Sequence, residues 1–328
     1  MRERTLRNEI VESSLSLPVM SIFTFLLWAS TSEWSDVMLW LSLAIVAVMA
    51  YVIVEWNNQC QLLRIRSRMN SVTFLALVNI FPLLHTAGLA LVPALCLLLT
   101  YFMLFKSYGE YKPQGYAFHG FFFLGVGSLF FPPMLLLAPT LFVSCNTQLR
   151  ILTLRTMSAL TLGLLLPFWL YTAAMAAASA LWGVEETRLS YFSLRLPDYS
   201  GIETWQWGAL ALVLVLGLIS VGHFLATSYN DKIRTRQFFF TMIPSFVPLL
   251  FFMAWWPEDF LITLPLLLLN LTPFMAHFMA LSKIKYITFV FWFIAFTAFL
   301  LGVVNYCDLW PYLYTGIDLP ELLRYIPI

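Results

Sequence analysis

The sequence predicts an all-α membrane protein of about eleven helices, and three observations support this fold class. Hydrophobic residues make up 61% of the 328 residues and charged residues only 11%, against about 45–50% and about 25% in soluble proteins. Apolar runs of about twenty residues recur along the chain, which is the length that crosses about 30 Å of hydrocarbon. All but three of the eighteen Lys and Arg residues lie in short clusters between these runs.

The basic clusters predict how the chain is oriented in the membrane. They occupy alternate gaps between the apolar runs, whereas most acidic residues occupy the other gaps. Short loops rich in Lys and Arg stay in the cytoplasm, so we expect a cytoplasmic N-terminus and an external C-terminus. The clusters are Arg2, Arg4 and Arg7; Arg64, Arg66 and Arg68; Lys106 and Lys112; Arg150 and Arg155; Lys232, Arg234 and Arg236; Lys283 and Lys285.

Nine apolar runs are long enough to be predicted as membrane spans. Apart from the uncharged gap at Ala87, the loops between them alternate in charge sign along the chain, which supports the segmentation independently of hydropathy. The runs cover residues 14–31, 37–55, 70–86, 88–105, 156–181, 208–228, 238–256, 259–281 and 286–305.

Residues 117–145 form the remaining apolar segment, and both of its flanks belong to the basic, cytoplasmic set. Pro132 and Pro133 lie at its middle and cannot donate helical hydrogen bonds. We therefore expect a short hairpin of two helices, shielded from lipid by other helices because exposed backbone is costly in hydrocarbon. Whether this hairpin crosses the membrane or is re-entrant is left open; either case preserves the orientation.

The whole chain, residues 1–328, is predicted to form a single membrane domain. Two stretches lie outside the bilayer, both on the external side. Residues 182–207 mix apolar and charged side chains in a way suited to lying on the membrane surface. The tail 306–328 contains Asp318 and Pro320 ahead of a short helical pattern.

Glu33 and Asp36, in the first external loop, are the first candidates for chemistry. Two carboxylates three residues apart could bind a divalent cation or accept a proton from a hydroxyl group. A pair of solvated loop charges accounts for them more simply. They are therefore weak candidates for catalytic residues.

Polar residues within the apolar runs are the second set of candidates, because such residues are costly in a membrane. Thr263, Asn270 and His277 recur every seven residues and share one helix face. Ser220, His223 and Thr227 share a face of the span 208–228, which leads to Asp231. The polar residues toward the cytoplasmic ends also include His119 and Glu55. Such a cluster could bind a metal or relay protons, and interfacial histidines bonded to helix ends explain the same pattern.

Two further groups are ambiguous. Arg64, Arg66 and Arg68 could bind lipid phosphate, and they equally serve to retain their loop in the cytoplasm. Asn79 and His85, with Pro82 between them, could line a cavity, although small irregularities are common in membrane helices.

One stretch resembles a known group of proteins. Residues 91–145 combine an apolar span, a polar turn with Lys and a Gly-rich leg that ends at an aromatic–Pro apex, and LRTMSALTLGLLLPFWLY (154–171) continues the pattern. This pattern resembles an uncharacterised family of bacterial multi-pass inner-membrane proteins. The resemblance implies a location in the bacterial inner membrane and no established activity.

The same stretch faintly resembles the GT-C glycosyltransferases, which use polyprenyl-phosphate sugars. Gly120, Gly125, Gly127 and Pro132 match the Gly and Pro positions of their pattern, and Glu33 and Asp36 stand where those enzymes carry an essential acidic residue. The resemblance implies a GT-C-like arrangement and, for an active enzyme, a divalent cation as cofactor. The chain departs from the pattern in its short first external loop and in Phe131, which replaces the Arg or Lys before the apex Pro.

These observations favour a non-catalytic or accessory cell-envelope protein on a GT-C-like scaffold. A lipid-linked-sugar glycosyltransferase and a small-molecule or lipid transporter remain as alternatives, so the sequence does not decide between enzyme, scaffold and transporter. The partners predicted are membrane lipid and, depending on the alternative, a polyprenyl-phosphate lipid or another membrane protein. The net charge of +1 and the lack of a dense basic block argue against nucleic acid.

Overall fold

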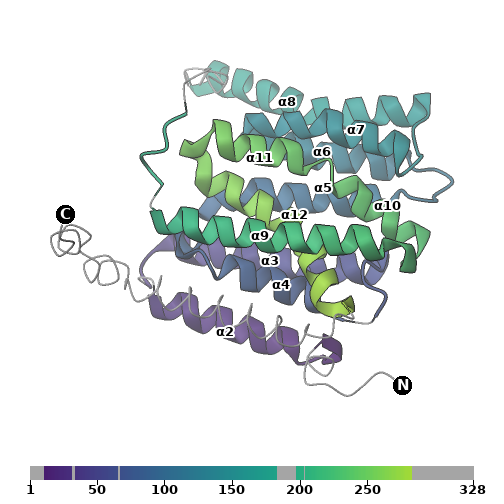
Figure 1. Ribbon diagram of the computed structural model, residues 1–328. Helices are drawn as coiled ribbons and strands as arrows, with labels where there is room; N and C mark the ends of the chain where they lie inside the picture. Colours follow the sequence, from purple (N-terminus) through teal and green to yellow (C-terminus); the bar gives the residue numbers. More distant parts are fainter. Residues whose placement is uncertain (1–10, 32–33, 66, 183–196, 203, 283–328) are drawn as a thin grey trace, which may run out of the picture.

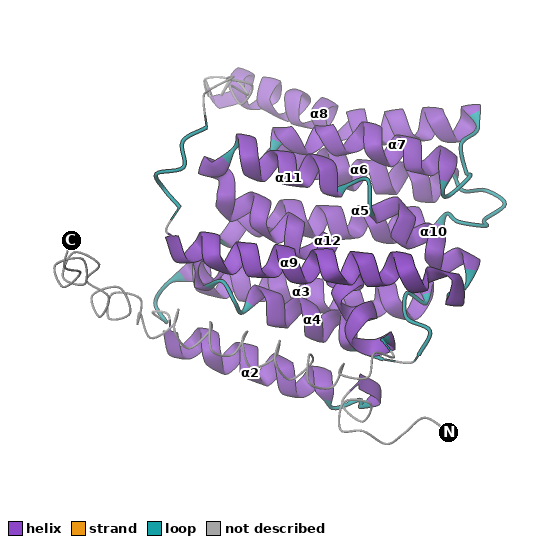
Figure 2. Cartoon of the chain, viewed as in Figure 1, coloured by secondary structure: helices purple, strands orange, loops and turns teal. Residues whose placement is uncertain are grey.

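The computed structural model describes residues 11–31, 34–65, 67–182, 197–202 and 204–282. Regular secondary structure in these ranges is helical (Figure 2). The predicted span 286–305 and the predicted tail 306–328 lie outside the described residues, as does most of the predicted surface segment 182–207.

The α-helices run roughly parallel to one another (Figure 1). Short 3₁₀ helices interrupt or extend them. In chain order the elements are α2 (Ser16–Thr31), α3 (Val37–Cys60), α4 (Met69–Val78), η1 (Pro82–Thr86), η2 (Gly88–Leu91), α5 (Val92–Lys106), α6 (Gln114–Phe130), η3 (Pro132–Leu136), α7 (Leu137–Thr147), α8 (Leu154–Trp182), α9 (Thr204–Thr227), η4 (Ser228–Asn230), α10 (Ile233–Met242), α11 (Phe246–Trp255), η5 (Pro257–Asp259) and α12 (Phe260–Leu281).

Six helical segments within the described residues are long and apolar enough to cross a membrane. This is the architecture of a multi-pass membrane protein, because only a helix satisfies its own backbone hydrogen bonds while surrounded by lipid. The six segments are Val37–Cys60, Gly88–Lys106, Leu154–Ala180, Gln206–Asn230, Ile233–Trp255 and Pro257–Leu281.

The helices form a row with α12 near its centre (Figure 1). Helix α8 packs on α6, α6 on α5, and α5 on both α3 and α12. Helix α4 follows, in contact with α3 and α12, and α2 lies beyond α4. Helices α9 and α11 pack against α12 from outside the row.

Helix α12 is almost completely enclosed: 89% of its most apolar stretch is buried. An apolar surface is compatible with this position, although in a membrane the same surface could equally face lipid. Pro265 and Pro273 lie inside it, and each removes a backbone donor. Beside Pro273, the Thr272 hydroxyl donates to the Leu268 carbonyl oxygen of the same helix at 2.8 Å.

Helices α6 and α8 approach each other closely through glycine. A Cβ atom on Gly163 would lie 2.3 Å from the Phe118 carbonyl oxygen, and one on Gly125 would lie 2.6 Å from the Leu164 carbonyl oxygen. Small residues at such positions let two membrane helices make backbone contact. The Gly-rich leg therefore has a packing role: Gly125 faces α8, whereas Gly120 faces α5 and Gly127 faces both α5 and η3.

The predicted hairpin is present, with α6 and α7 joined at Pro132 and Pro133. Two predicted spans, in contrast, are not single continuous helices, although the second, as part of Ile233–Trp255, is still long and apolar enough to cross a membrane. The run 70–86 forms only α4, followed by η1 that starts at Pro82, because proline disfavours a helical conformation in the residue before it. The run 238–256 is divided into α10 and α11 by a turn at residues 243–245, which contains Pro244.

One end of the bundle carries the described Lys and Arg clusters, and we call it the basic end. The connecting segments 107–113, 148–153 and 228–232 and the α3–α4 loop lie together there (Figure 1). The opposite end carries the α2–α3 and α11–α12 connections, with Asp36, Glu258 and Asp259. The alternation of charge along the sequence thus becomes a separation of charge between two ends of the structure.

Candidate functional site at the basic end

Asp231 is the centre of the candidate site. It follows η4, between α9 and α10, and its side chain is fully buried. One carboxylate oxygen, Oδ2, lies 2.9 Å from Nε2 of His277 on α12, and the other, Oδ1, lies 2.9 Å from Nε of Arg64. We call Arg64, Asp231 and His277 the ion trio. An ionised carboxylate can only accept, so Nε2 of His277 is the donor in its contact.

The ion trio connects three segments that are far apart in the sequence. Arg64 belongs to the α3–α4 loop, and its Nη1 also donates to the Asn230 carbonyl oxygen at 3.2 Å. Its side chain retains 31% exposure, whereas those of Asp231 and His277 have none. A buried carboxylate is stable only when paired and hydrogen-bonded. Asp231 therefore holds the α3–α4 loop, the α9–α10 loop and α12 together.

His277 lies among aromatic rings. The rings of Phe224 and Phe239 are 5.4 and 5.5 Å from its own, centroid to centroid. The ring of His223, on α9, lies 5.9 Å away. No hydrogen-bond partner is found for Nδ1 of His223 or of His277 within the described residues. Asp231 is therefore the polar contact that orients the His277 imidazole.

A polar pocket of about 400 Å³ lies beside the ion trio. Its lining comes from the C-terminal turn of α3, the α3–α4 loop and the start of α10. Two cations, Arg64 and Lys232, line it. The neutral polar residues of the lining are Asn57, Asn58, Gln61, Ser67 and Thr235. We call this cavity the basic-end pocket.

Hydrogen bonds between its two walls give the basic-end pocket its shape. Gln61 ends α3 in the left-handed conformation, with φ of 54°. Its carbonyl oxygen accepts from the Thr235 hydroxyl and its side-chain Oε1 from Lys232 Nζ, both at 3.1 Å. Across the loop, the Asn57 amide donates to the Ser67 carbonyl oxygen at 3.0 Å. The pocket is thus braced on both sides.

The electrostatics of the basic-end pocket favour an anion. Its lining contains two cations and no carboxylate, and Asp231 lies behind Arg64 and neutralises part of its charge. An Arg guanidinium held by a carboxylate on one edge keeps its other N–H groups in a fixed fork, which matches phosphate oxygens. The arrangement can therefore bind a phosphate group. Within the described part of the chain, His, Cys, Asp and Glu form no group of three that could hold a metal ion.

The polar stripe on α12 divides between two environments. His277 joins the ion trio, whereas Asn270 bonds within the core. Its Oδ1 accepts from the Tyr101 hydroxyl at 2.8 Å, and its Nδ2 donates to the Met242 carbonyl oxygen at 3.3 Å. The Thr263 hydroxyl donates to the Phe260 carbonyl oxygen of its own helix at 3.4 Å. Asn270 thus fastens α12 to α5 and to the end of α10.

The other predicted candidates of the basic side do not join the ion trio. The Ser220 hydroxyl donates to the Leu216 carbonyl oxygen of its own helix at 2.7 Å. His119 is exposed on α6, with Nδ1 2.6 Å from the Gly115 carbonyl oxygen. Glu55 accepts from Gln59 on the same helix. These contacts are local and support helix structure.

Asp36 caps α3: its carboxylate accepts from the Met38 N–H at 2.8 Å. Glu33 lies outside the described residues.

Asn79 has a structural contact, because its Oδ1 accepts from Trp28 Nε1 at 3.0 Å and its Nδ2 donates to the Thr24 hydroxyl at 2.9 Å. These bonds fasten α2 to the end of α4.

The basic-end pocket was not predicted from the sequence. Asn57, Gln61 and Thr235 have no unusual spacing, and they meet only when α3 and α10 come together. One signal was available in Asp231, an acidic residue directly before a basic cluster on the side rich in Lys and Arg. An acidic residue that departs from its loop's charge pattern is a reason to look for a buried ion pair.

Comparisons of the chain with protein-family models, with curated proteins and with solved structures give no match. The basic-end pocket and the ion trio are therefore the features of the molecule from which a function is inferred.

Proposed function

We propose that this protein is a non-catalytic, accessory protein of the bacterial inner membrane that binds a phosphate-bearing ligand in the basic-end pocket. The observation that carries the proposal is the pair of cations, Arg64 and Lys232, that line a polar cavity of about 400 Å³. The orientation predicted from the basic clusters puts this pocket on the cytoplasmic side.

Three features of the pocket support ligand binding rather than simple loop retention. Retention needs only charge in the loop, whereas Arg64 is oriented by a buried carboxylate and Lys232 by Gln61. The neutral amides and hydroxyls of the lining supply further donors. The braced walls reduce the entropy lost when a ligand binds.

The test is isothermal titration of the purified full-length protein in phosphatidylcholine nanodiscs, with inorganic pyrophosphate as the probe. Wild type is expected to bind, and Lys232→Gln and Arg64→Gln are each expected to raise Kd by about ten- to hundredfold, since a charge-assisted hydrogen bond contributes about 1.5–3 kcal/mol. Arg155→Gln is the matched control, because Arg155 is an exposed cation of the basic end outside the pocket lining.

Two outcomes would refute this function. One is a wild-type protein that does not bind pyrophosphate, and the other is a Kd that Lys232→Gln and Arg64→Gln leave at the wild-type value. Because Arg64 also belongs to the ion trio, Lys232→Gln tests the pocket without disturbing the ion trio.

Anion transport is the second candidate function, and the ion trio favours it. A carboxylate buried against an imidazole in a membrane bundle is a common proton-binding arrangement, and here it adjoins an anion pocket. Proteoliposomes containing a pH-sensitive dye would show proton movement when pyrophosphate is added, and Asp231→Asn would abolish it. Binding without such movement leaves the accessory function.

The glycosyltransferase alternative gains no support from Asp36. Its carboxylate is occupied as the N-cap of α3, and Asp36 does not line the basic-end pocket. We therefore do not propose sugar transfer.

A further inference from the structure

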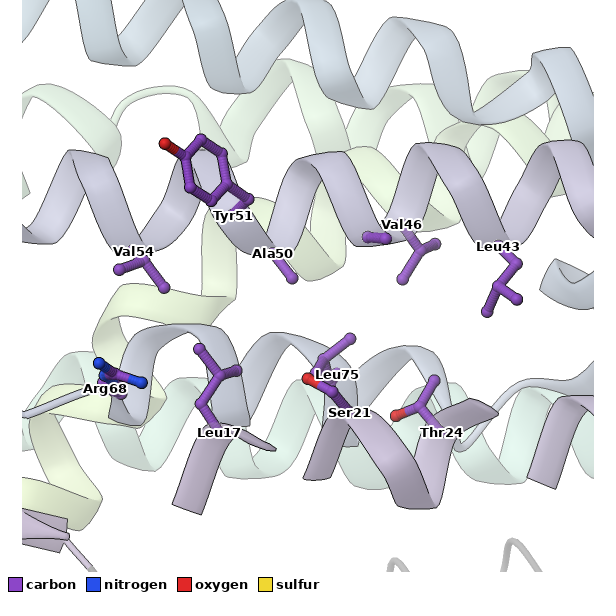
Figure 3. Close-up of a pocket in the computed structure, with 11 residues that line it drawn as sticks. Leu17, Ser21, Thr24, Leu43, Val46, Ala50, Tyr51, Val54, Arg68 and Leu75 are labelled. Atoms are coloured by element: carbon purple, nitrogen blue, oxygen red, sulfur yellow. The ribbon is translucent and has the colours of Figure 1, made fainter. Parts of the chain in front are cut away.

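A second cavity, separate from the basic-end pocket, opens between α2, α3 and α4. Its volume is about 390 Å³. Figure 3 shows the α3 side chains Val46, Ala50 and Val54 along one wall and residues of α2 and α4 along the other. The lining is mainly apolar, and Arg68 stands at one end, near Leu17 and Val54. We call this cavity the α2–α3 groove.

The length and direction of the α2–α3 groove match one leaflet of a bilayer. It follows α3 from Leu43 to Val54, which is about 16 Å at about 1.5 Å per residue. The hydrocarbon core of a whole bilayer is about 30 Å thick. The groove therefore starts at the basic end, at Arg68, and reaches about the middle of the membrane.

Arg68 supplies charge where a lipid headgroup would lie. It is exposed, and its Nη1 donates to the Ser14 carbonyl oxygen at 3.3 Å. A guanidinium has five N–H donors, so Arg68 can keep this bond and still bind phosphate oxygens. Two polar side chains of α2 line the groove, and neither makes it strongly polar. The Thr24 hydroxyl donates to the Met20 carbonyl oxygen, and Ser21 contributes a single hydroxyl group. The remainder of the groove suits a hydrocarbon chain.

We propose that the α2–α3 groove holds an anionic phospholipid of the leaflet next to the basic end, with one acyl chain in the groove and the phosphate on Arg68. Charge complementarity at one end, an apolar lining and a length of one leaflet together select this occupant. The site is independent of the basic-end pocket, because the two cavities share no lining residue.

The test measures lipid retained by the full-length protein in native mass spectra, after incorporation into bilayers of equal parts phosphatidylglycerol and phosphatidylcholine. Wild type is expected to keep one phosphatidylglycerol in preference to phosphatidylcholine. Arg68→Gln removes the preference, because it removes the charge that selects the headgroup. Ala47→Phe, which fills the groove from an exposed position on α3, lowers retention of both lipids at least about tenfold.

Matched controls separate the groove from general membrane charge. Arg155→Gln removes an exposed cation of the basic end, and Ala44→Phe adds the same ring at an exposed position of α3 outside the lining; both are expected to behave as wild type. The proposal is overturned if Arg68→Gln retains the wild-type preference, or if Ala47→Phe and Ala44→Phe retain equal amounts. It is also overturned if a cross-linker on Ser21→Cys captures residues 283–328 of the same chain with no lipid retained.

Discussion

Helices α8 and α12 have the same mean hydropathy but opposite surroundings. Only 17% of the most apolar stretch of α8 is buried inside the structure, against 89% of that of α12. In a membrane this difference is physically reasonable, because lipid tails are as apolar as the protein core. Hydropathy shows that a segment belongs in the membrane and carries no information about whether it faces lipid or protein.

The partners of the polar side chains distinguish the two helices. On α8 the hydroxyls of Thr161 and Thr172 donate to carbonyl oxygens of their own helix. On α12 Asn270 and His277 reach other segments, namely α5, the end of α10 and the α9–α10 loop. A polar group that cannot satisfy itself locally forces its helix toward a partner, and that requirement orders the helices around α12.

The largest effect is expected at the contact that anchors α12 to the basic end. Asp231→Ala leaves His277 and Arg64 without their carboxylate, and we expect a loss of roughly 3–5 kcal/mol of unfolding free energy, as for other broken buried pairs. Thermal unfolding measures the change. It is monitored by alkylation of three thiols that are buried in the folded protein, Cys60, Cys96 and Cys145, in a Cys307→Ser background.

Glu110→Ala is the control for this substitution, since Glu110 is an exposed carboxylate of the basic end; its effect should stay within about 0.5 kcal/mol. Equal stability of the Asp231→Ala and Glu110→Ala proteins would break the comparison, because α12 would then not depend on its polar contacts.

The next largest effect on stability is expected from the close packing of α8 against α6. Gly163→Ala puts a methyl group 2.3 Å from the Phe118 carbonyl oxygen, so the helices must separate, at a cost of about 1–3 kcal/mol. Gly222→Ala on α9 is the same change at a position with no neighbour within 4 Å, and it should leave stability unchanged or raise it by up to about 1 kcal/mol. If both variants unfold at the same temperature, close α6–α8 packing is not what retains α8.

A smaller effect is expected from the bond between α5 and α12. Tyr101→Phe and Asn270→Leu each remove one side of a buried hydrogen bond, and a double-mutant cycle should give a coupling of about 1 kcal/mol, near the values for other membrane proteins. The same alkylation assay supplies the four stabilities. A coupling energy indistinguishable from zero would show that the Tyr101–Asn270 hydrogen bond does not stabilise the packing of α12 on α5.

The smallest effect is expected for Thr172→Val on α8. The hydroxyl is exposed and bonds only within its helix, so its removal should change the unfolding free energy by less than about 0.5 kcal/mol. A loss comparable with that of Asn270→Leu would mean that the polar groups of α8 also have distant partners, and would remove the distinction between the two helices.

Sequence reasoning located the apolar segments, the Pro132–Pro133 hairpin and the separation of basic from acidic loops. It failed where proline ended a helix early, as at Pro82, because a window of hydropathy does not register a missing backbone donor. For the site, the sequence placed His223 and His277 toward the same side of the membrane, and the structure brings their rings to 5.9 Å, centroid to centroid. The pairing of Asp231 with Arg64 could not be predicted, because the two residues are far apart in the sequence. Asn230, which precedes Asp231 and also bonds Arg64, is 166 positions away from it.

The amino-acid sequence by itself determined that the chain forms apolar helices and that its cations collect at one end. Both follow from solvation, which each residue experiences independently of its distant neighbours. Tertiary structure alone decided that α12 is central and α8 peripheral, that Asp231 has two partners, and that Arg64, Lys232 and Arg68 line two different cavities. The physical reason is that lipid and protein interior solvate apolar side chains equally well, so glycine contacts and distant hydrogen bonds choose between arrangements that hydropathy cannot distinguish.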